Sequence, residues 1–319
     1  MGWLENYPRE YYSKYDHVEV KNSRGWFEVY RLPGDVYAIA EPQQFQEVNF
    51  FLIIGDGRAM LLDTGMGIEP IEPLIHELLE MRGIDTTREN LTVINCHCHF
   101  DHTGNNYVFQ PVHVYDDPLA LRIAEHGLTK EEVGGEMEDY MFQFGYPEGF
   151  DPDDYHVEPY QVIPVTDGQV FDLGNRTIRV IHTPGHCPDH LCLYDETHHI
   201  LFTGDLLYLG ALYTHFDNPI YGTGNIYDYR DSLNRVRDEL PEDVKLYCSH
   251  NDLVTDYAKL CEVADAMQQV IDTEEGKETG LTAQGAAPGH DYGEAENQPH
   301  VYQFGAFSIY CRPGLVTKT

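Results

Sequence analysis

The chain has 319 residues, of which 42% are hydrophobic, so it is long enough to bury a substantial core in one large domain or two smaller ones. Its 54 acidic and 20 basic residues give a formal net charge of −34, which repels phosphate backbones and anionic lipid surfaces and excludes nucleic acid as an expected partner. No apolar stretch approaches the roughly 20 residues of a membrane helix, and the N-terminus lacks the layout of a secretory signal, so we expect a soluble, cytoplasmic protein with no membrane partner.

The first third of the chain begins as a series of short strands. Apolar runs separated by the turn formers Pro-Gly-Asp and Gly-Asp-Gly predict strands at residues 26–32, 36–40, 49–54 and 59–62. Apolar residues at helical spacing then predict a helix over residues 71–82, which Gly83 ends. A further strand, predicted at residues 91–96, leads directly into a cluster of histidines.

The middle of the chain changes in composition. Residues 116–160 are acidic, aromatic and rich in glycine and proline, which predicts an insertion over the core with helices at 118–126 and 130–144. Beyond the insertion, strand signals occur at residues 161–165, 177–181, 191–194, 200–203 and 244–248. A Tyr-rich loop is expected at residues 208–227 and a helix at 229–240.

The C-terminal part is predicted to hold a helix at residues 255–271, a Gly/Ala/Glu-rich excursion at 272–299 and a last strand at 301–311. Strands and helices interspersed along the whole chain indicate an α/β or α+β fold with sheets as its core. We expect one domain spanning residues 1–319, with the insertion at about 116–160 and a C-terminal extension at about 272–319.

The sequence NCHCHFDHTGNN at residues 95–106 carries the strongest chemical signal. His97, His99, Asp101 and His102 lie within six positions, directly after a predicted strand. On an extended loop, His97 and His99 can point the same way, while Asp101 and His102 turn toward a neighbouring position. The spacing therefore predicts two adjacent metal sites.

Other candidate ligands also follow predicted strands. His186 comes after the Pro-Gly turn of HTPGH, Asp205 ends FTGD, and His250 ends YCSH. Loops at one edge of a sheet pair can converge on a pocket, and five histidines with two aspartates suffice for two borderline metal ions, each with an open position. The seven cysteines contain no CxxC pair, so we expect reduced, buried thiols and assign none of them as a ligand.

HCHFDH followed by HTPGH, TGD and SH, with LLDTG upstream at residues 61–65, resembles the metallo-β-lactamase-fold hydrolases, in their glyoxalase II-like and lactonase-like branch. The resemblance covers roughly residues 26–255 and implies an αββα sandwich with the site at one edge of the two sheets. It also implies that Asp63 orients the motif loop instead of binding metal. By position, it implies one metal on His97, His99 and His186, and a second on Asp101, His102 and His250, with Asp205 bridging.

The expected activity is that of a dinuclear metal-dependent hydrolase that cleaves an ester, lactone or thioester with a metal-bridging hydroxide. The family's usual metal is zinc, and iron or manganese is also found among its members. Asp205 would fix the metal separation and Asp101 could accept a proton. The resemblance to lactonases implies that Tyr208 donates to the developing oxyanion, and the alternative for Tyr208 is packing in an aromatic loop.

Two other activities share this set of motifs: a small-molecule phosphodiesterase, and a mononuclear-iron oxygenase of the persulfide dioxygenase type. A non-catalytic scaffold is a further alternative, which the complete ligand set argues against. The expected partner is a small molecule, neutral or cationic and partly apolar, held by the insertion at 116–160 and the loop at 208–227. Whether the chain forms a homo-oligomer is left open.

Overall fold

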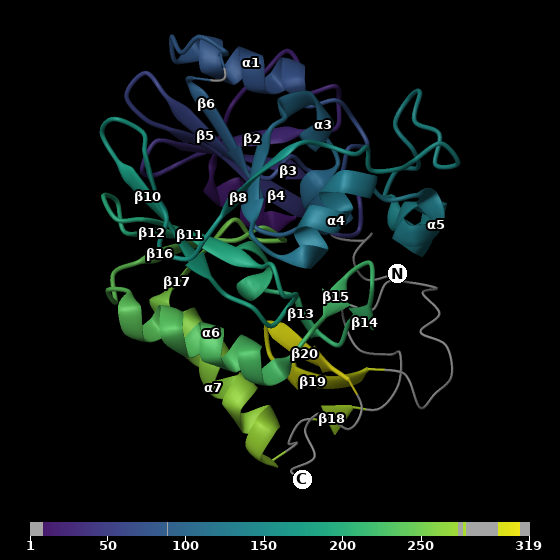
Figure 1. The fold of residues 1–319 in the computed structure, drawn as a ribbon, viewed down its shortest axis with the longest axis vertical. Helices are drawn as coiled ribbons and strands as arrows, with labels where there is room; N and C mark the ends of the chain where they lie inside the picture. Colours follow the sequence, from purple (N-terminus) through teal and green to yellow (C-terminus); the bar gives the residue numbers. More distant parts are fainter. Residues whose placement is uncertain (1–8, 88, 274–276, 279–298, 313–319) are drawn as a thin grey trace.

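The computed structural model describes residues 9–87, 89–273, 277–278 and 299–312, and Figure 1 shows how their elements are arranged. One sheet has eight strands that lie side by side in sequence order, antiparallel from β1 to β5 and parallel from β5 to β8. These strands are β1 (Asp16–His17), β2 (Glu28–Leu32), β3 (Val36–Glu41), β4 (Val48–Ile54), β5 (Ala59–Leu62), β6 (Leu91–Ile94), β7 (Val112–Tyr115) and β8 (Val162–Val165).

A second sheet has six strands in the order β17-β16-β12-β11-β10-β9, and only its β12–β16 pair is parallel. Its strands are β9 (Val170–Asp172), β10 (Thr177–His182), β11 (Leu191–Asp195), β12 (Ile200–Phe202), β16 (Lys245–Tyr247) and β17 (Val254–Asp256). The longer helices are α1 (Glu72–Met81), α4 (Pro118–His126), α6 (Ile226–Glu239) and α7 (Tyr257–Thr273). In Figure 1, α1 and α4 lie beside the first sheet, and α6 and α7 lie together beyond the second.

Side chains alternate between the two faces of each strand, and this alternation explains how the sheets and helices pack in layers. On β4, Phe50 and Leu52 belong to the apolar cluster that also contains the buried residues of α1 and α4, whereas Phe51 points to the other side. There Phe51 meets Phe202 of the second sheet, with ring centroids 5.3 Å apart. A third cluster joins the outer face of the second sheet to α6 and α7. The fold is therefore the expected αββα sandwich, and each large side chain buried in it stabilises the folded state by roughly 1.5–3 kcal/mol.

Two smaller sheets flank the sandwich. The four-stranded one has the order β13-β20-β19-β18 and contains β13 (Ala211–Thr214), β18 (Lys277–Glu278), β19 (His300–Phe304) and β20 (Phe307–Cys311). The two-stranded one pairs β14 (Asp217–Asn218) with β15 (Gly222–Thr223). The remaining short elements are α2 (Phe100–Thr103), α3 (Asn106–Phe109), α5 (Lys130–Val133), η2 (Glu10–Lys14), η3 (Gly134–Met137), η4 (Asp139–Met141) and η5 (Gly204–Leu206).

Several predicted elements were wrong. The helix expected at 130–144 ends at Val133, because Gly134 adopts a φ of 70° and two short 3₁₀ turns follow. The last strand, expected at 301–311, is two antiparallel strands, because Gly305 with a φ of 54° turns the chain back. The loop expected at 208–227 contains β13, β14 and β15, and β7 was not predicted. Most of the excursion expected at 272–299 lies outside the described residues, and the single-domain partition stays a prediction.

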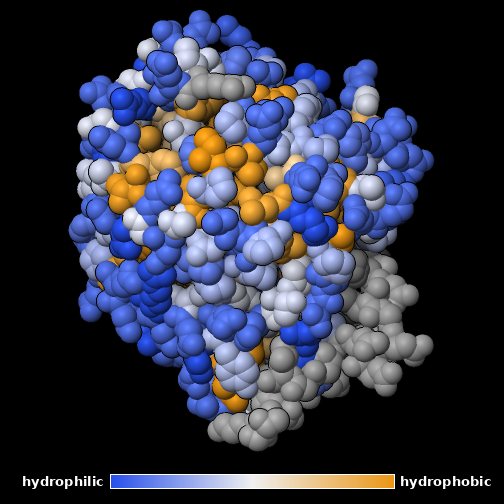
Figure 2. Space-filling view, in the orientation of Figure 1, coloured by the Kyte–Doolittle hydropathy of each residue, from blue (hydrophilic) through white to orange (hydrophobic). Residues whose placement is uncertain are grey.

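In the described part of the chain, no helix combines the length and the apolar character that crossing a bilayer requires. Figure 2 shows one face of the molecule, most of it hydrophilic, with hydrophobic residues gathered in a band across its upper half. This mostly hydrophilic face agrees with the acidic composition of the chain.

Candidate metal centre

The seven predicted metal ligands are brought together at one edge of the two sheets, where the loops after β6, β10, β12 and β16 meet. Each side chain comes from a segment that follows a strand, and each residue is at most 6% exposed. Asp101 and His102 lie on the short helix α2, and Asp205 lies on the 3₁₀ turn η5. These residues are His97, His99, Asp101, His102, His186, Asp205 and His250.

Three imidazoles form one group. A ligand atom of each of His97, His99 and His186 lies within 4.8 Å of the other two, and the Cys187 sulfur belongs to the same group. His186 Nε2 lies 3.1 Å from His99 Nδ1. The arrangement matches the first of the two ligand sets that the sequence implied.

Asp101, His102 and His250 form a second group within the same 4.8 Å limit. The Asp205 carboxylate reaches both groups. Its Oδ1 lies 3.1 Å from His250 Nε2 and 3.4 Å from His102 Nε2, and its Oδ2 lies 3.5 Å from His186 Nε2. Asp205 thus occupies the position between the two groups in which a carboxylate can contact both metal sites at once.

Backbone carbonyls orient three of the imidazoles. An imidazole nitrogen that donates to a carbonyl leaves the other ring nitrogen with its lone pair directed at the site. The pairs are His186 Nδ1 with Tyr213 O at 3.0 Å, His99 Nε2 with Tyr221 O at 3.0 Å, and His250 Nδ1 with Gln46 O at 2.7 Å. Sequence reasoning missed these contacts, because a backbone carbonyl leaves no signature in the side-chain pattern.

Asp63 holds His102 in place. Its Oδ2 lies 2.9 Å from His102 Nδ1, and its Oδ1 accepts a hydrogen bond of 2.8 Å from the backbone N–H of Cys96. Asp63 follows β5 directly and has a φ of 65°, so its side chain faces the loop that carries the histidines. Through these two bonds, one carboxylate fixes both a candidate ligand and the start of its loop.

Two glycines allow the ligand loops to pack closely. A Cβ on Gly185, next to His186, would lie 2.3 Å from the backbone nitrogen of Tyr229 on α6. A Cβ on Gly204, next to Asp205, would lie 2.6 Å from His190 Nε2. That ring nitrogen accepts a 2.9 Å hydrogen bond from the backbone N–H of Asp205. His190 therefore contacts the turn that carries Asp205 and helps to hold it in place.

The donor atoms fit divalent metal ions. Four of them are buried and make no hydrogen bond to the described residues: His97 Nε2, His102 Nε2, His250 Nε2 and Asp205 Oδ1. The approaches of Asp205 Oδ1 to His250 and His102 are close ionic contacts without hydrogen-bond geometry, and such buried atoms are costly unless another ligand satisfies them. Burial lowers the pKa of His97 and His186 well below the ordinary imidazole value, so both rings are neutral at pH 7 and can donate a lone pair. Imidazole and carboxylate ligands suit zinc, iron and manganese.

Tyr208 lies beside this centre. Its ring packs against that of His250, with centroids 4.8 Å apart, and its residue is 4% exposed. Its hydroxyl donates a hydrogen bond to the backbone oxygen of Ala211. To assist at a substrate oxygen, the hydroxyl would have to leave Ala211, and its catalytic role stays a prediction.

The cysteines are free thiols in the described structure, and six of the seven are buried. Two lie nearer to the centre than the sequence indicated. The Cys187 sulfur belongs to the first imidazole group, and the Cys96 sulfur lies 3.1 Å from His97 Nδ1. Cys96 also donates to Asp63 Oδ2, at 3.0 Å, so its thiol is part of the network under the second group.

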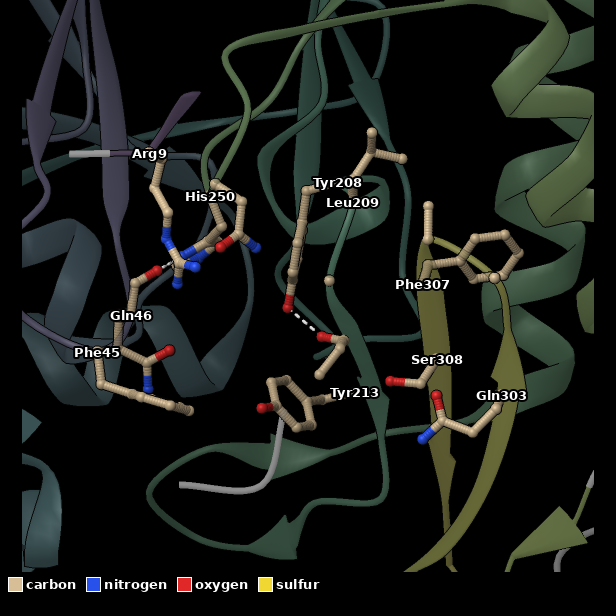
Figure 3. Close-up of a pocket in the computed structure, with 15 residues that line it drawn as sticks. Arg9, Phe45, Gln46, Tyr208, Leu209, Tyr213, His250, Gln303, Phe307 and Ser308 are labelled. Atoms are coloured by element: carbon tan, nitrogen blue, oxygen red, sulfur yellow. Dashed lines mark hydrogen bonds between the residues drawn. The ribbon is translucent and has the colours of Figure 1, made fainter. Parts of the chain in front are cut away.

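A cavity of about 320 Å³ opens beside His250 and Tyr208. Figure 3 shows Tyr208 and His250 on one side of it and the β19–β20 hairpin on the other, with Tyr213 below. Arg9, Phe45 and Gln46 lie along the side nearest His250. The segment 208–227, expected to hold the substrate, contributes Tyr208, Leu209, Gly210, Ala211 and Tyr213 to the lining, and none of the described lining residues comes from the segment 116–160. That either segment holds a substrate stays a prediction.

Residues 44–250 match the family model described as the metallo-beta-lactamase superfamily. The human acyl-coenzyme A thioesterase MBLAC2 is 29% identical over 194 residues, which are 59% of this chain and 68% of that protein. The atrochrysone carboxyl ACP thioesterase of Passalora fulva is 31% identical over 202 residues, which are 61% of this chain and 46% of that protein.

A solved structure has the same fold. A metallo-beta-lactamase family protein from Thermus thermophilus superimposes with a TM-score of 0.54 at 22% identity. The match covers 77% of this chain and 85% of that one.

Proposed function

The chain belongs to the metallo-beta-lactamase superfamily and is a metal-dependent hydrolase, and we propose that it hydrolyses acyl thioesters at a centre for two divalent metal ions. The observation that carries the proposal is the pair of ligand groups, each within 4.8 Å, that share the Asp205 carboxylate. The thioester class is supported by the names of the two thioesterases described above.

We assign His97, His99 and His186 to the first ion, and Asp101, His102 and His250 to the second, with Asp205 shared. When bound, two divalent ions supply Lewis acidity, which polarises a carbonyl oxygen and lowers the pKa of water toward ~7. Zinc is the first choice for this donor set, and iron and manganese are compatible with it. The Cys187 sulfur is close enough to contact an ion held by the first group.

The protein's own residues position the reactants. Asp63 fixes the ring of His102 through its 2.9 Å contact, which prevents rotation of that ligand. We assign Asp101, whose Oδ2 lies 3.7 Å from His250 Nε2, as the acceptor of the proton that the attacking water loses. Tyr208, beside His250, is the candidate donor to the carbonyl oxygen of the substrate once its hydroxyl turns away from Ala211.

A thioester is a suitable substrate for a site without an assigned nucleophilic side chain. Water is the nucleophile, the C–S bond breaks, and the products are a carboxylic acid and a free thiol. The thiolate is a good leaving group, so no strong general acid is needed on the sulfur side. Hydrolysis of a thioester by the metal-loaded centre would therefore need no nucleophilic side chain.

The test is a metal measurement followed by a substrate panel on the same sample. The protein is expressed with ample zinc, iron and manganese, and the ions per chain are counted by mass spectrometry. Release of thiol from acetyl-coenzyme A is then followed with a thiol-reactive dye, beside a lactone, a carboxylic ester and a chromogenic phosphodiester.

We expect about two ions per chain, thioester hydrolysis above the rates for the other substrates, and loss of activity on chelation. Hydrolysis of the phosphodiester alone would contradict the proposal and identify a phosphodiesterase. One iron per chain with oxygen consumption would identify an oxygenase. Protein without bound metal under these conditions would falsify the assignment of the seven ligands.

A further inference from the structure

The cavity beside His250 has a wall that the superfamily match does not cover. The match ends at residue 250, whereas Gln303, Phe307 and Ser308 of the β19–β20 hairpin line the cavity. The hairpin is held against the site because β20 pairs in parallel with β13, which follows the loop that carries Tyr208. At about 320 Å³, the cavity lies at the lower end of the roughly 300–1,000 Å³ typical of ligand pockets.

The chemistry of the lining differs from that of the chain as a whole. The sequence has 54 acidic residues in 319, yet no carboxylate is among the described residues that line the cavity. Its polar groups include the carboxamides of Gln46, Asn251 and Gln303 and the guanidinium of Arg9, whose charge is paired with Glu47. Its apolar surface includes the rings of Tyr213 and Phe307. A lining of this kind favours an uncharged ligand with its own hydrogen-bonding groups over a cation.

Gln303 is the clearest recognition group in the cavity. It pairs with Ser308 across the hairpin, so both side chains stand on the same face of the sheet, and Figure 3 shows both directed into the cavity. Its Nε2 is buried, and no hydrogen-bond partner is present for it among the described residues. A buried amide nitrogen without a partner is costly, and a ligand carbonyl would satisfy it.

We infer that this cavity binds the amide-bearing arm of a pantetheine thioester, with the Gln303 carboxamide as a recognition group. Coenzyme A and acyl carrier proteins attach the acyl group to the same arm, which contains two secondary amides between its thiol and its phosphate. An arm lying along the cavity from His250 would present its amides to the carboxamides of the lining. The inference rests on the proposed thioesterase activity, since it identifies the part of the substrate that this cavity holds.

A hydrocarbon acyl chain is the competing occupant. The Gln303 carboxamide argues against it, because its buried Nε2 has no partner among the described residues and a hydrocarbon would supply none. The carbonyl oxygens of an amide arm can accept a hydrogen bond from that nitrogen. The amide arm is therefore the better match for this lining.

The experiment compares two acetyl thioesters whose thiols have equal length. One thiol is pantetheine, and the other is an oligoether that lacks amides. For each, kcat/KM is measured on the metal-loaded protein. Binding of the corresponding non-hydrolysable S-methyl thioethers is measured by calorimetry, which does not depend on turnover.

We expect kcat/KM for the pantetheine thioester to exceed that for the oligoether thioester at least tenfold. Gln303→Leu should lower this ratio about fivefold or more, which corresponds to the loss of one hydrogen bond to a buried group. The near-isosteric Gln303→Glu, which adds a carboxylate, should do the same and serves where the leucine variant folds poorly. The matched control is Gln161→Leu, because Gln161 is exposed and outside the cavity, and it should leave the ratio unchanged.

Equal rates and equal binding for the two arms would overturn the inference, and so would a preference that persists in both Gln303 variants. With octanoyl in place of acetyl on both thiols, a rise in kcat/KM that the Gln303 variants abolish would show a hydrocarbon occupant and overturn the inference. If neither thioester is cleaved, the proposed function fails. Selective binding of the pantetheine thioether, reduced in the Gln303 variants, would then still support the assignment of the cavity.

Discussion

Asp63 contacts one of the proposed metal ligands and the backbone of the loop that carries it. The residue is fully buried, and its two carboxylate oxygens contact His102 Nδ1 and the backbone of Cys96. The contact with His102 leaves its Nε2 facing Asp101 and Asp205. The carboxylate therefore determines both the tautomer and the direction of this imidazole.

We predict that Asp63→Asn weakens metal binding at the second group by about 10–100-fold, because the amide can present its NH₂ to the ring nitrogen and disturb the tautomer. Titration of the metal-free protein with a competing chelator measures the affinity. Asp85→Asn, on an exposed aspartate, is the control. An unchanged affinity in Asp63→Asn would show that the loop alone orients His102.

Glu41 makes stability depend on pH. The residue is fully buried and accepts hydrogen bonds of 2.8 Å from Trp26 Nε1 and from the backbone N–H of Met66. Burial raises its pKa from the ordinary 4.5 to about 7. The folded state holds the proton to higher pH than the unfolded state, so this residue makes the free energy of unfolding fall as pH rises from about 4.5 to about 7.

The glutamine of Glu41→Gln has no proton to lose between about pH 4.5 and about pH 7. The unfolding free energy of the variant minus that of the wild type should therefore rise with pH from about 4.5 to about 7, by at most about 1.4 kcal/mol per pH unit. Urea unfolding at several pH values measures the difference. Glu80→Gln, on the exposed face of α1, should show no such trend. A difference that is constant with pH would mean that Glu41 stays ionised in the folded protein.

At the residue scale, the sequence predicted which side chains gather but not what holds them. The histidines and aspartates could be found because their side-chain types follow strands at characteristic spacings. Their orienting partners Gln46, Tyr213 and Tyr221 act through backbone oxygens, which every residue has. The proximity of Cys187 to the first group depends on the turn at Gly185, which side-chain types do not specify.

The loop that follows β10 packs tightly against α6, and this packing depends on one glycine. Gly185 has a φ of 137°, and a Cβ there would lie 2.3 Å from the backbone of Tyr229. Its carbonyl accepts a hydrogen bond of 2.8 Å from the backbone N–H of Asn225, the residue that caps α6. The loop that carries His186 is therefore fitted directly against the start of α6.

We predict that Gly185→Ala lowers the free energy of unfolding by roughly 2–4 kcal/mol, because a strained φ and a steric overlap add together. Gly57→Ala is the matched control, since Gly57 also has a positive φ, 67°, but a Cβ there meets nothing within 4 Å. Chemical denaturation of both variants separates strain from overlap. Equal losses would mean that α6 moves aside at little cost.

The bounds of helices and strands were predicted best where the apolar residues follow a single helical or strand period. The strand β5 and the helix α4 have the expected bounds, and α1 differs from its prediction by one residue at each end. The helix expected at 130–144 failed because the Gly134-Gly135 pair outweighs the flanking helix formers. The single C-terminal strand failed because an apolar run does not show where a two-residue turn at Gly305 reverses it.

At the scale of the whole molecule, charge is the dominant feature. A net charge of −34 on one chain creates repulsion between surface carboxylates, which destabilises the compact state. We predict that the melting temperature rises by at least a few degrees between about 10 mM and about 1 M NaCl, as the Debye length falls from roughly 30 Å to 3 Å. Calorimetry in NaCl and in KCl measures the effect. A melting temperature that stays constant or falls would mean that favourable ion pairs outweigh the repulsion.

The sandwich itself could be predicted from the family motifs together with strand alternation, because both faces of each sheet are covered. The four-stranded sheet could not. Its β13 and β20 pair in parallel although Leu212 and Ile309 are nearly a hundred residues apart in sequence. The hydrophobic pattern within a short segment does not indicate a pairing between strands that lie so far apart in the sequence.

The hairpin β19–β20 lines the cavity from outside the segment that matches the superfamily. All seven proposed metal ligands lie within residues 44–250, whereas Gln303 and Ser308, on the opposite wall of the cavity, lie beyond residue 250. If the cavity holds part of the substrate as proposed, insertions or exchanges in the hairpin would alter which molecules bind and leave the proposed metal ligands in place. The hairpin is accordingly the segment to exchange when engineering a new substrate preference into this scaffold.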